Sequence, residues 1–202
     1  MSFRKVLLFG AVVVFGLAGT AHAQFGLYGT YAGTDVTGVT CLDPQSICSA
    51  SGGGVRPFGA AGGIYYDFKS YGPVRLGFDL RADLLHASKS ASSRTGGVGA
   101  TRAHTALGGV RATFHTPVSY LRPYAQASVG WTSSNVTEPN VETYDNFLQY
   151  QVFAGADVRV FPILDVRVVE LGIGGMDRVG TGLGASSLGV KSISAGIVFH
   201  LP

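Results

Sequence analysis

The stretch Val74-Arg-Leu-Gly-Phe-Asp-Leu-Arg-Ala-Asp-Leu84 decides the fold, because apolar and polar residues alternate along its whole length. Side chains of a β-strand point alternately to its two faces, so one face of this segment is apolar and the other carries charges. An α-helix would spread both sets of residues around its circumference. The segment is therefore predicted to be a strand that separates an apolar environment from a polar one.

Alternation of this kind continues along the rest of the chain. It recurs clearly in Leu148–Phe161 and in Lys191–Leu201, which are both long enough to cross a bilayer as tilted strands. Weaker copies predict further strands at Phe25–Thr34, Phe58–Lys69, Thr101–His115, Pro123–Ser133 and Asp165–Gly175.

Two of the weaker strands change the parity of their alternation partway. The change falls at Gly108-Gly109 in Thr101–His115, and around Glu170-Leu171-Gly172 in Asp165–Gly175. A β-bulge shifts the facing of a strand by one residue. Bulges are therefore predicted at both places.

The connections between the predicted strands alternate between short and long. The short ones carry proline and are Ser70–Pro73, Thr116–Arg122 and Pro162–Leu164. The long ones are rich in small and polar residues and are Asp35–Pro57, Ser88–Ala100, Ser134–Phe147 and Met176–Ser187. An even number of strands with short turns at one end and long loops at the other is typical of outer-membrane barrels. The chain is predicted to be all-β, an eight-stranded antiparallel up-and-down transmembrane β-barrel with periplasmic turns and extracellular loops.

Alternation alone does not decide which face points inward. Charges of both signs lie on the polar faces and can pair across a narrow lumen, whereas the apolar faces carry many small residues and aromatic residues near the strand ends. These features favour an apolar exterior; a soluble barrel holding a ligand among inward apolar residues is the alternative. A lumen charge network is predicted to contain Arg75, Asp79, Arg81, Asp83, Arg111, Asp157, Arg159, Arg167 and Glu170, with Asp67 and Lys69 on the same polar faces.

The N-terminal segment has the pattern of an export signal. Arg4 and Lys5 precede the apolar run Val6–Gly19, and the small residues Ala21 and Ala23 precede Gln24. This order is typical of a secretory signal peptide cleaved before residue 24. We therefore predict a signal peptide over 1–23 and a barrel domain over 24–202, with an uncleaved membrane anchor as the alternative.

Composition excludes several classes of protein. The charged fraction is 13% and the hydrophobic fraction 46%, which excludes intrinsic disorder, and no cluster of basic residues suggests a nucleic-acid partner. Cys41 and Cys48 lie close together in a chain predicted to be exported, which predicts one disulfide in the first long loop. A metal site would need further ligands near these cysteines, so neither a metal nor another cofactor is predicted.

Three segments resemble one known family, the eight-stranded outer-membrane β-barrel proteins of the OmpA/OmpX and opacity-protein type. Arg122–Trp131 is similar to the fifth strand of that family, and Ala154–Arg167 to the hairpin of its sixth and seventh strands. The tail Ser194–Leu201 is similar to its C-terminal assembly signal. The resemblance implies Sec-dependent export to the bacterial outer membrane, with periplasmic chaperones and a barrel assembly machine as partners. By the same resemblance, that machine would read Ser194, Gly196, Phe199 and Leu201.

No enzymatic motif accounts for the chain. His86 and Ser88 form an H-x-S pair similar to that of the lipid A deacylases, but the pair lies early in the chain and its flanking sequence differs from theirs. A polar strand end is the favoured interpretation, and no enzyme is predicted. The predicted function is a structural or surface-interaction role of the long loops. The alternatives are a narrow passive pore, a lipid-active enzyme and a soluble ligand-binding barrel.

Overall fold

The computed structural model describes residues 24–37, 56–87, 101–118, 120–138, 141–179 and 188–201. The predicted signal peptide with Ala21 and Ala23, the two cysteines Cys41 and Cys48, and Ser88 lie outside these residues. In the described ranges no helix is long and apolar enough to span a membrane.

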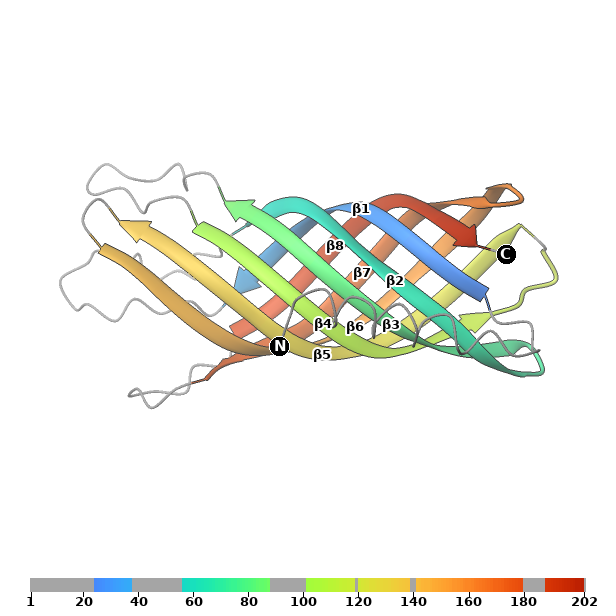
Figure 1. The fold of residues 1–202 in the computed structure, drawn as a ribbon, viewed down its shortest axis with the longest axis horizontal. Coiled ribbons are helices and arrows are strands. Elements are labelled where there is room, and N and C mark those ends of the chain that lie inside the picture. Colours follow the sequence, from blue (N-terminus) through green and yellow to red (C-terminus); the bar gives the residue numbers. More distant parts are fainter. Residues whose placement is uncertain are drawn as a thin grey trace, which may run out of the picture.

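Eight antiparallel strands form one closed barrel in which each strand pairs with the next along the chain and the last pairs with the first (Figure 1). The predicted eight-stranded antiparallel up-and-down β-barrel is confirmed. The strands are β1 (Gln24–Thr37), β2 (Phe58–Tyr71), β3 (Val74–Ala87), β4 (Thr101–Phe114), β5 (Leu121–Glu138), β6 (Val141–Phe161), β7 (Leu164–Arg178) and β8 (Leu188–Leu201).

The short turns gather at one end of the barrel, together with the first residue of β1 and the last of β8 (Figure 1). We call this the turn end and the opposite end the loop end. Gly72 and Pro73 join β2 to β3, and Gly72 has a φ of 57°, a left-handed conformation that glycine adopts without steric cost. Pro162 and Ile163 form the tight turn between β6 and β7.

The predicted loop over Ser134–Phe147 is wrong. β5 continues to Glu138 and β6 begins at Val141, and the two pair through Ser134↔Asp145 and Thr137↔Glu142. Most residues of Ser134–Asn146 are polar, and apolar and polar residues do not alternate regularly there. The sequence therefore lacks the pattern that reveals the other strands.

The predicted bulge at Gly108-Gly109 is also wrong, because the register of β4 against β3 and β5 runs through these residues without a shift. The change of parity arises because Leu107, an apolar residue, points into the barrel and is buried. In β7 the register instead shifts between Arg167 and Glu170, just before the predicted position. This shift brings both of those side chains into the lumen.

An unpredicted bulge in β2 changes the position of a lysine. The register against β3 shifts between Asp67 and Lys69, so Asp67 is buried inside the barrel while Lys69 lies on the exposed outer face, 4.7 Å from the centre of the Tyr71 ring. The prediction that Lys69 lies on the inner face is wrong.

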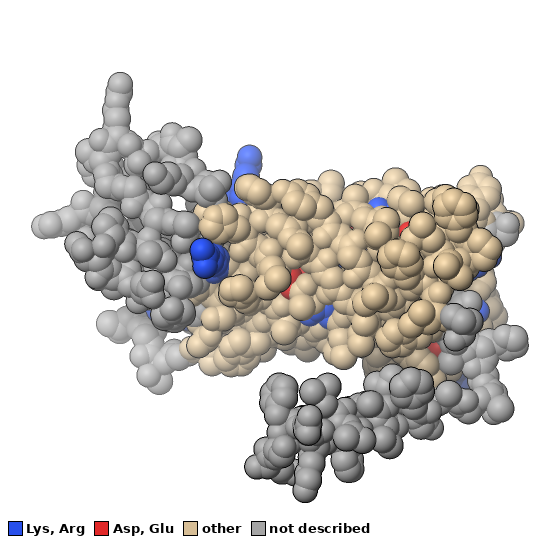
Figure 2. Space-filling view, turned by 45° about the horizontal axis from the view of Figure 1, so that its top comes forward, with Lys and Arg blue, Asp and Glu red and all other residues tan. Residues whose placement is uncertain are grey.

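The outer wall of the barrel is apolar. Leu80, Leu84 and Val110 are each more than half exposed, whereas the charged residues Asp79, Arg81 and Arg111 on the same strands are buried. In Figure 2 the wall between the two ends is predominantly uncharged. The observed facing is the opposite of that in a soluble barrel with an apolar interior.

The closing seam between β1 and β8 depends on a glycine. A Cβ atom at position 196 would lie 2.1 Å from the carbonyl oxygen of Gly29, whereas one at position 29 would meet nothing within 4 Å. We expect Gly196→Ala to lower the free energy of unfolding by about 1–3 kcal/mol, the usual cost of overpacking. Gly29→Ala, on the paired strand, should be close to neutral. Urea unfolding in detergent, followed by the fluorescence of the chain's one tryptophan, measures both variants. Equal midpoints would contradict the close approach at this seam.

Candidate functional site: the charged lumen

Two arginines stack between tyrosine rings at the centre of the lumen. The guanidinium carbon of Arg111 lies 4.1 Å from the ring centre of Tyr65 and 3.9 Å from that of Tyr124. That of Arg167 lies 4.6 Å from Tyr124 and 4.4 Å from Tyr28. The side chains therefore alternate ring, cation, ring, cation, ring and come from five strands, β2, β4, β5, β7 and β1. Cations held over aromatic faces are stabilised by the ring quadrupole, most of all away from water.

One aspartate joins the two arginines. Arg111 donates to Asp157 Oδ2 at 2.9 Å, and Nε of Arg167 donates to Asp157 Oδ1 at 2.9 Å. All three side chains are fully buried or nearly so. Asp157 lies opposite Arg167 in the register of β6 and β7. The two positive charges are thus held near each other by the carboxylate between them.

Glu170 is the second acidic centre of the network. It accepts hydrogen bonds from Arg81 on β3, Arg167 on its own strand, Tyr124 on β5 and Ser194 on β8. Its carboxylate therefore connects both sides of the lumen. The bulge in β7 makes this possible, because without it residues 167 and 170 would point to opposite faces.

The last charged layer towards the loop end contains Arg81, Asp83 and Asp79, and neutral polar and apolar side chains lie beyond it. Arg81 donates to Asp83 at 2.9 Å, and its guanidinium carbon lies 4.4 Å from the ring centre of Phe153. Asp79 accepts hydrogen bonds from Tyr28 at 3.0 Å and from Gln126 at 2.7 Å. Beyond this layer the lumen wall includes Thr105, Thr132, Gln149, Gln151, Leu85, Met176 and Val190.

A separate cluster lies in the lumen near the turn end. His200 Nε2 is 2.7 Å from Asp165 Oδ2, and Arg122 donates to the same oxygen at 3.2 Å. The other ring nitrogen of His200 is 3.2 Å from the hydroxyl of Tyr65. These contacts connect β8 to β7, β5 and β2, so they bridge the barrel next to its closing strand.

The structure brings together seven of the nine residues predicted for the lumen network. They are buried and linked by the contacts above: Asp79, Arg81, Asp83, Arg111, Asp157, Arg167 and Glu170.

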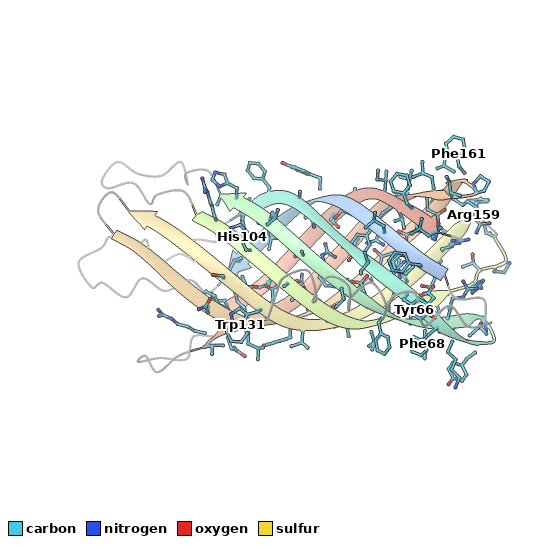
Figure 3. The ribbon with its side chains drawn as sticks, in the orientation of Figure 1. Tyr66, Phe68, His104, Trp131, Arg159 and Phe161 are labelled. Atoms are coloured by element: carbon cyan, nitrogen blue, oxygen red, sulfur yellow. The ribbon has the colours of Figure 1, made fainter. Side chains whose placement is uncertain are left out.

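Two of the nine lie outside this cluster. Arg75 is half-buried near the turn end, 3.4 Å from His115, and Arg159 is exposed at the rim of the same end (Figure 3). Parity assigns both to the inner face, but these positions lie where the lumen opens.

Sequence reasoning did not include several members of the network. Arg122 lies in a predicted connection and Asp165 is the first residue of a predicted strand, so alternation does not assign either of them to a face. His200 lies opposite the apolar residues of Lys191–Leu201, and this parity could have identified it. The three stacked tyrosines carry a polar hydroxyl on an apolar ring and fit either face. Gln126, Gln149 and Gln151 have inward parity, which could have identified them.

The residues of the predicted assembly signal occupy both faces of β8. Ser194 is buried and donates to Glu170, and Gly196 lies against the backbone of β1. Phe199 and Leu201 are exposed on the outer face at the turn end. The recognition of these residues by an assembly machine stays a prediction.

Little space is left inside the barrel. A cavity of about 20 Å³ lies near the turn end among Arg75, Arg111 and Arg122, and one of about 40 Å³ lies towards the loop end. Among the described residues, no three His, Cys, Asp or Glu side chains form a group that could hold a metal ion.

The barrel is similar to solved structures of several bacterial proteins. Ail, the attachment invasion locus protein of Yersinia pestis, matches with a TM-score of 0.56 at 11% identity, covering 90% of this chain and 100% of Ail. Neisserial surface protein A matches with a TM-score of 0.56 at 14% identity, covering 89% of this chain and 99% of that one. The fold is that of the small outer-membrane barrels.

A third solved structure is similar over nearly the same share of this chain. The outer membrane protein OprG from Pseudomonas aeruginosa has a TM-score of 0.57 at 11% identity, with 89% of this chain and 96% of OprG covered. No family model matches the chain, and the comparison with curated proteins finds no relative. At these identities the likeness concerns the fold.

The lumen network makes a sharp prediction about stability. Arg167→Met removes a cation that pairs with both Asp157 and Glu170, and it leaves each of these buried carboxylates with only one arginine. Removing one partner of a buried ion pair costs about 3–5 kcal/mol. Arg159→Met makes the same chemical change at the exposed rim, where substitutions usually alter stability by less than about 0.5 kcal/mol. Urea midpoints in detergent compare the two variants. A loss of stability for Arg167→Met no greater than that for Arg159→Met would contradict the buried network.

Proposed function

We propose that this chain is an integral protein of the bacterial outer membrane, exported by its signal peptide, with the loop end at the cell surface. The observation that supports this most strongly is the inverted facing of the barrel, which has apolar side chains outside and paired charges inside. Such an exterior suits hydrocarbon, and a closed barrel leaves no strand edge unpaired in lipid. Assembly machinery that reads the β8 tail is part of this proposal.

The barrel is proposed to be closed to ions. Eight strands enclose an interior that side chains just fill, and here Arg111, Phe153, Arg167 and Glu170 are among the largest fully buried side chains. The stack of rings and guanidinium groups crosses the lumen. The two cavities of about 20 and 40 Å³ lie towards opposite ends of the barrel and share no lining residue. A structural or surface-interaction role through the loops is therefore favoured over a pore.

A lipid-active enzyme has less support than the surface role. His86 lies on the exposed face of β3, because its parity is that of Leu80 and Leu84. Ser88 lies outside the described residues. The proposed disulfide between Cys41 and Cys48 would constrain the first surface loop.

Electrophoresis of unboiled and boiled protein tests the membrane assignment. A folded membrane barrel resists SDS, so we expect the unboiled protein, refolded into phosphatidylcholine vesicles, to migrate differently from the boiled one. Protection of the barrel from protease in intact vesicles should accompany the shift. A refolded protein that stays in solution after the vesicles are sedimented would contradict the proposal.

Planar-bilayer recordings test the closed lumen separately. We expect no steady single-channel conductance from the inserted wild-type barrel. Glu170→Ala should open intermittent conductance, because it removes the carboxylate that joins Arg81, Arg167 and Ser194. A steady conductance of the wild-type protein would establish the pore instead.

A further inference from the structure

Three guanidinium groups converge on the cavity of about 20 Å³ near the turn end, which we call the mouth cavity. Arg75 on β3, Arg111 on β4 and Arg122 on β5 line it. Two carboxylates, those of Asp67 and Asp157, are also in its wall. Asp157 is already bridged to two arginines in the central network. The lining of the mouth cavity therefore favours an anionic ligand.

The charged side chains that solvent reaches at the turn end are basic throughout the described residues. Arg75 and Arg122 are half-buried, and Arg159 is exposed at the rim. The carboxylates at this end are all buried in the lumen, and they belong to Asp67, Asp157 and Asp165. An anion that approaches the barrel from the turn end consequently meets positive charge first.

Two buried atoms in the lining of the mouth cavity have no hydrogen-bond partner among the described residues. One is Nη1 of Arg111, which is a donor, and the other is Oδ1 of Asp67, which is an acceptor. The great majority of buried polar atoms in native proteins have a partner. A ligand that carries an acceptor and a donor close together would supply both.

The carboxyl end of a peptide has this combination of groups. Its carboxylate can accept two parallel hydrogen bonds from a guanidinium, and its last backbone N–H lies beside the carboxylate. Capture of a C-terminal carboxylate is a recurrent mode of peptide recognition. The mouth cavity admits one small group, so the rest of the peptide stays outside the barrel. The turns Gly72-Pro73 and Pro162-Ile163 are short enough to leave it room there.

We propose that the mouth cavity binds the free α-carboxylate of a peptide on the periplasmic side, as a docking site for the C-terminus of a periplasmic protein. Arg75 and Arg122 hold the carboxylate, and Asp67 accepts a hydrogen bond from the last backbone N–H. Both arginines have inward parity, so the lipid headgroups around the outer face are not the expected ligand. The inference rests on the proposed function, because it needs the turn end to face the periplasm.

Titration of the isotope-labelled barrel in detergent micelles, where both ends are accessible, tests the site by backbone NMR. The probes are N-acetyl-trialanine with a free C-terminus, the C-terminal amide of the same peptide, and acetate. The variants are Arg75→Gln and Arg159→Gln. Arg159→Gln is the matched control, because Arg159 is exposed at the same end but does not line the mouth cavity.

We expect the peptide with a free C-terminus to shift the amide signals of Thr113 and His200, which line the mouth cavity, and not that of Thr132 at the loop end. The amidated peptide and acetate should both bind more weakly, because one lacks the charge and the other lacks the N–H. Arg75→Gln should weaken binding of the free peptide about tenfold, the effect of one hydrogen bond to a charged group. Arg159→Gln should leave the affinity unchanged.

Equal affinities of the free and the amidated peptide would overturn the carboxylate site. An affinity for acetate that matches that for the peptide would overturn the assignment to a peptide. A wild-type affinity of Arg75→Gln would contradict the placement of the ligand in the mouth cavity.

Insertion into vesicles is measured separately by the electrophoretic shift on boiling. A wild-type barrel that inserts but does not bind the free peptide overturns this site alone. A barrel that does not insert overturns the proposed function, and with it the periplasmic setting of the site.

Discussion

The shared carboxylate of Asp157, held between the guanidinium groups of Arg111 and Arg167, is the interaction on which the rest of the barrel depends. A closed sheet of eight strands has an interior that side chains just fill, so charges on the inner face lose most of their water. They are tolerable only when they pair with one another. Tyrosine rings stack against both cations and fill part of the interior beside the ion pairs.

The same constraint explains the position of the apolar residues. Once the charges occupy the inner face, parity places Leu80, Leu84 and Val110 on the outside. Aromatic residues lie near both ends of this wall, with Trp131 at the loop end and Tyr66, Phe68 and Phe161 towards the turn end (Figure 3). Interfacial aromatic residues of this kind flank the apolar band of membrane barrels. The lumen and the outer wall are thus two consequences of one alternating pattern.

Alternation made the strand order and most of the network predictable, because the inner faces of Val74–Leu84 and Leu148–Phe161 are regular over many residues. Alternation does not predict how far along the barrel axis a residue lies. The position of Arg159 at the open rim was therefore not predictable from it. Lys69 lies outside because the bulge at Phe68 leaves no mark in the sequence. The extension of β5 and β6 to Glu138 and Val141 was missed because the sequence there shows no regular alternation.

A double-mutant cycle between Arg81 and Glu170 tests the central claim most directly, because these residues face each other across the lumen from β3 and β7. The unfolding free energies of Arg81→Met, Glu170→Gln and the double variant are compared with that of the wild-type barrel in detergent. Residues in one buried network typically show coupling energies of about 0.5–3 kcal/mol. We predict a coupling near the upper end of this range, with the double variant far less destabilised than the sum of the two single variants. Additive effects would contradict a paired, water-excluding lumen.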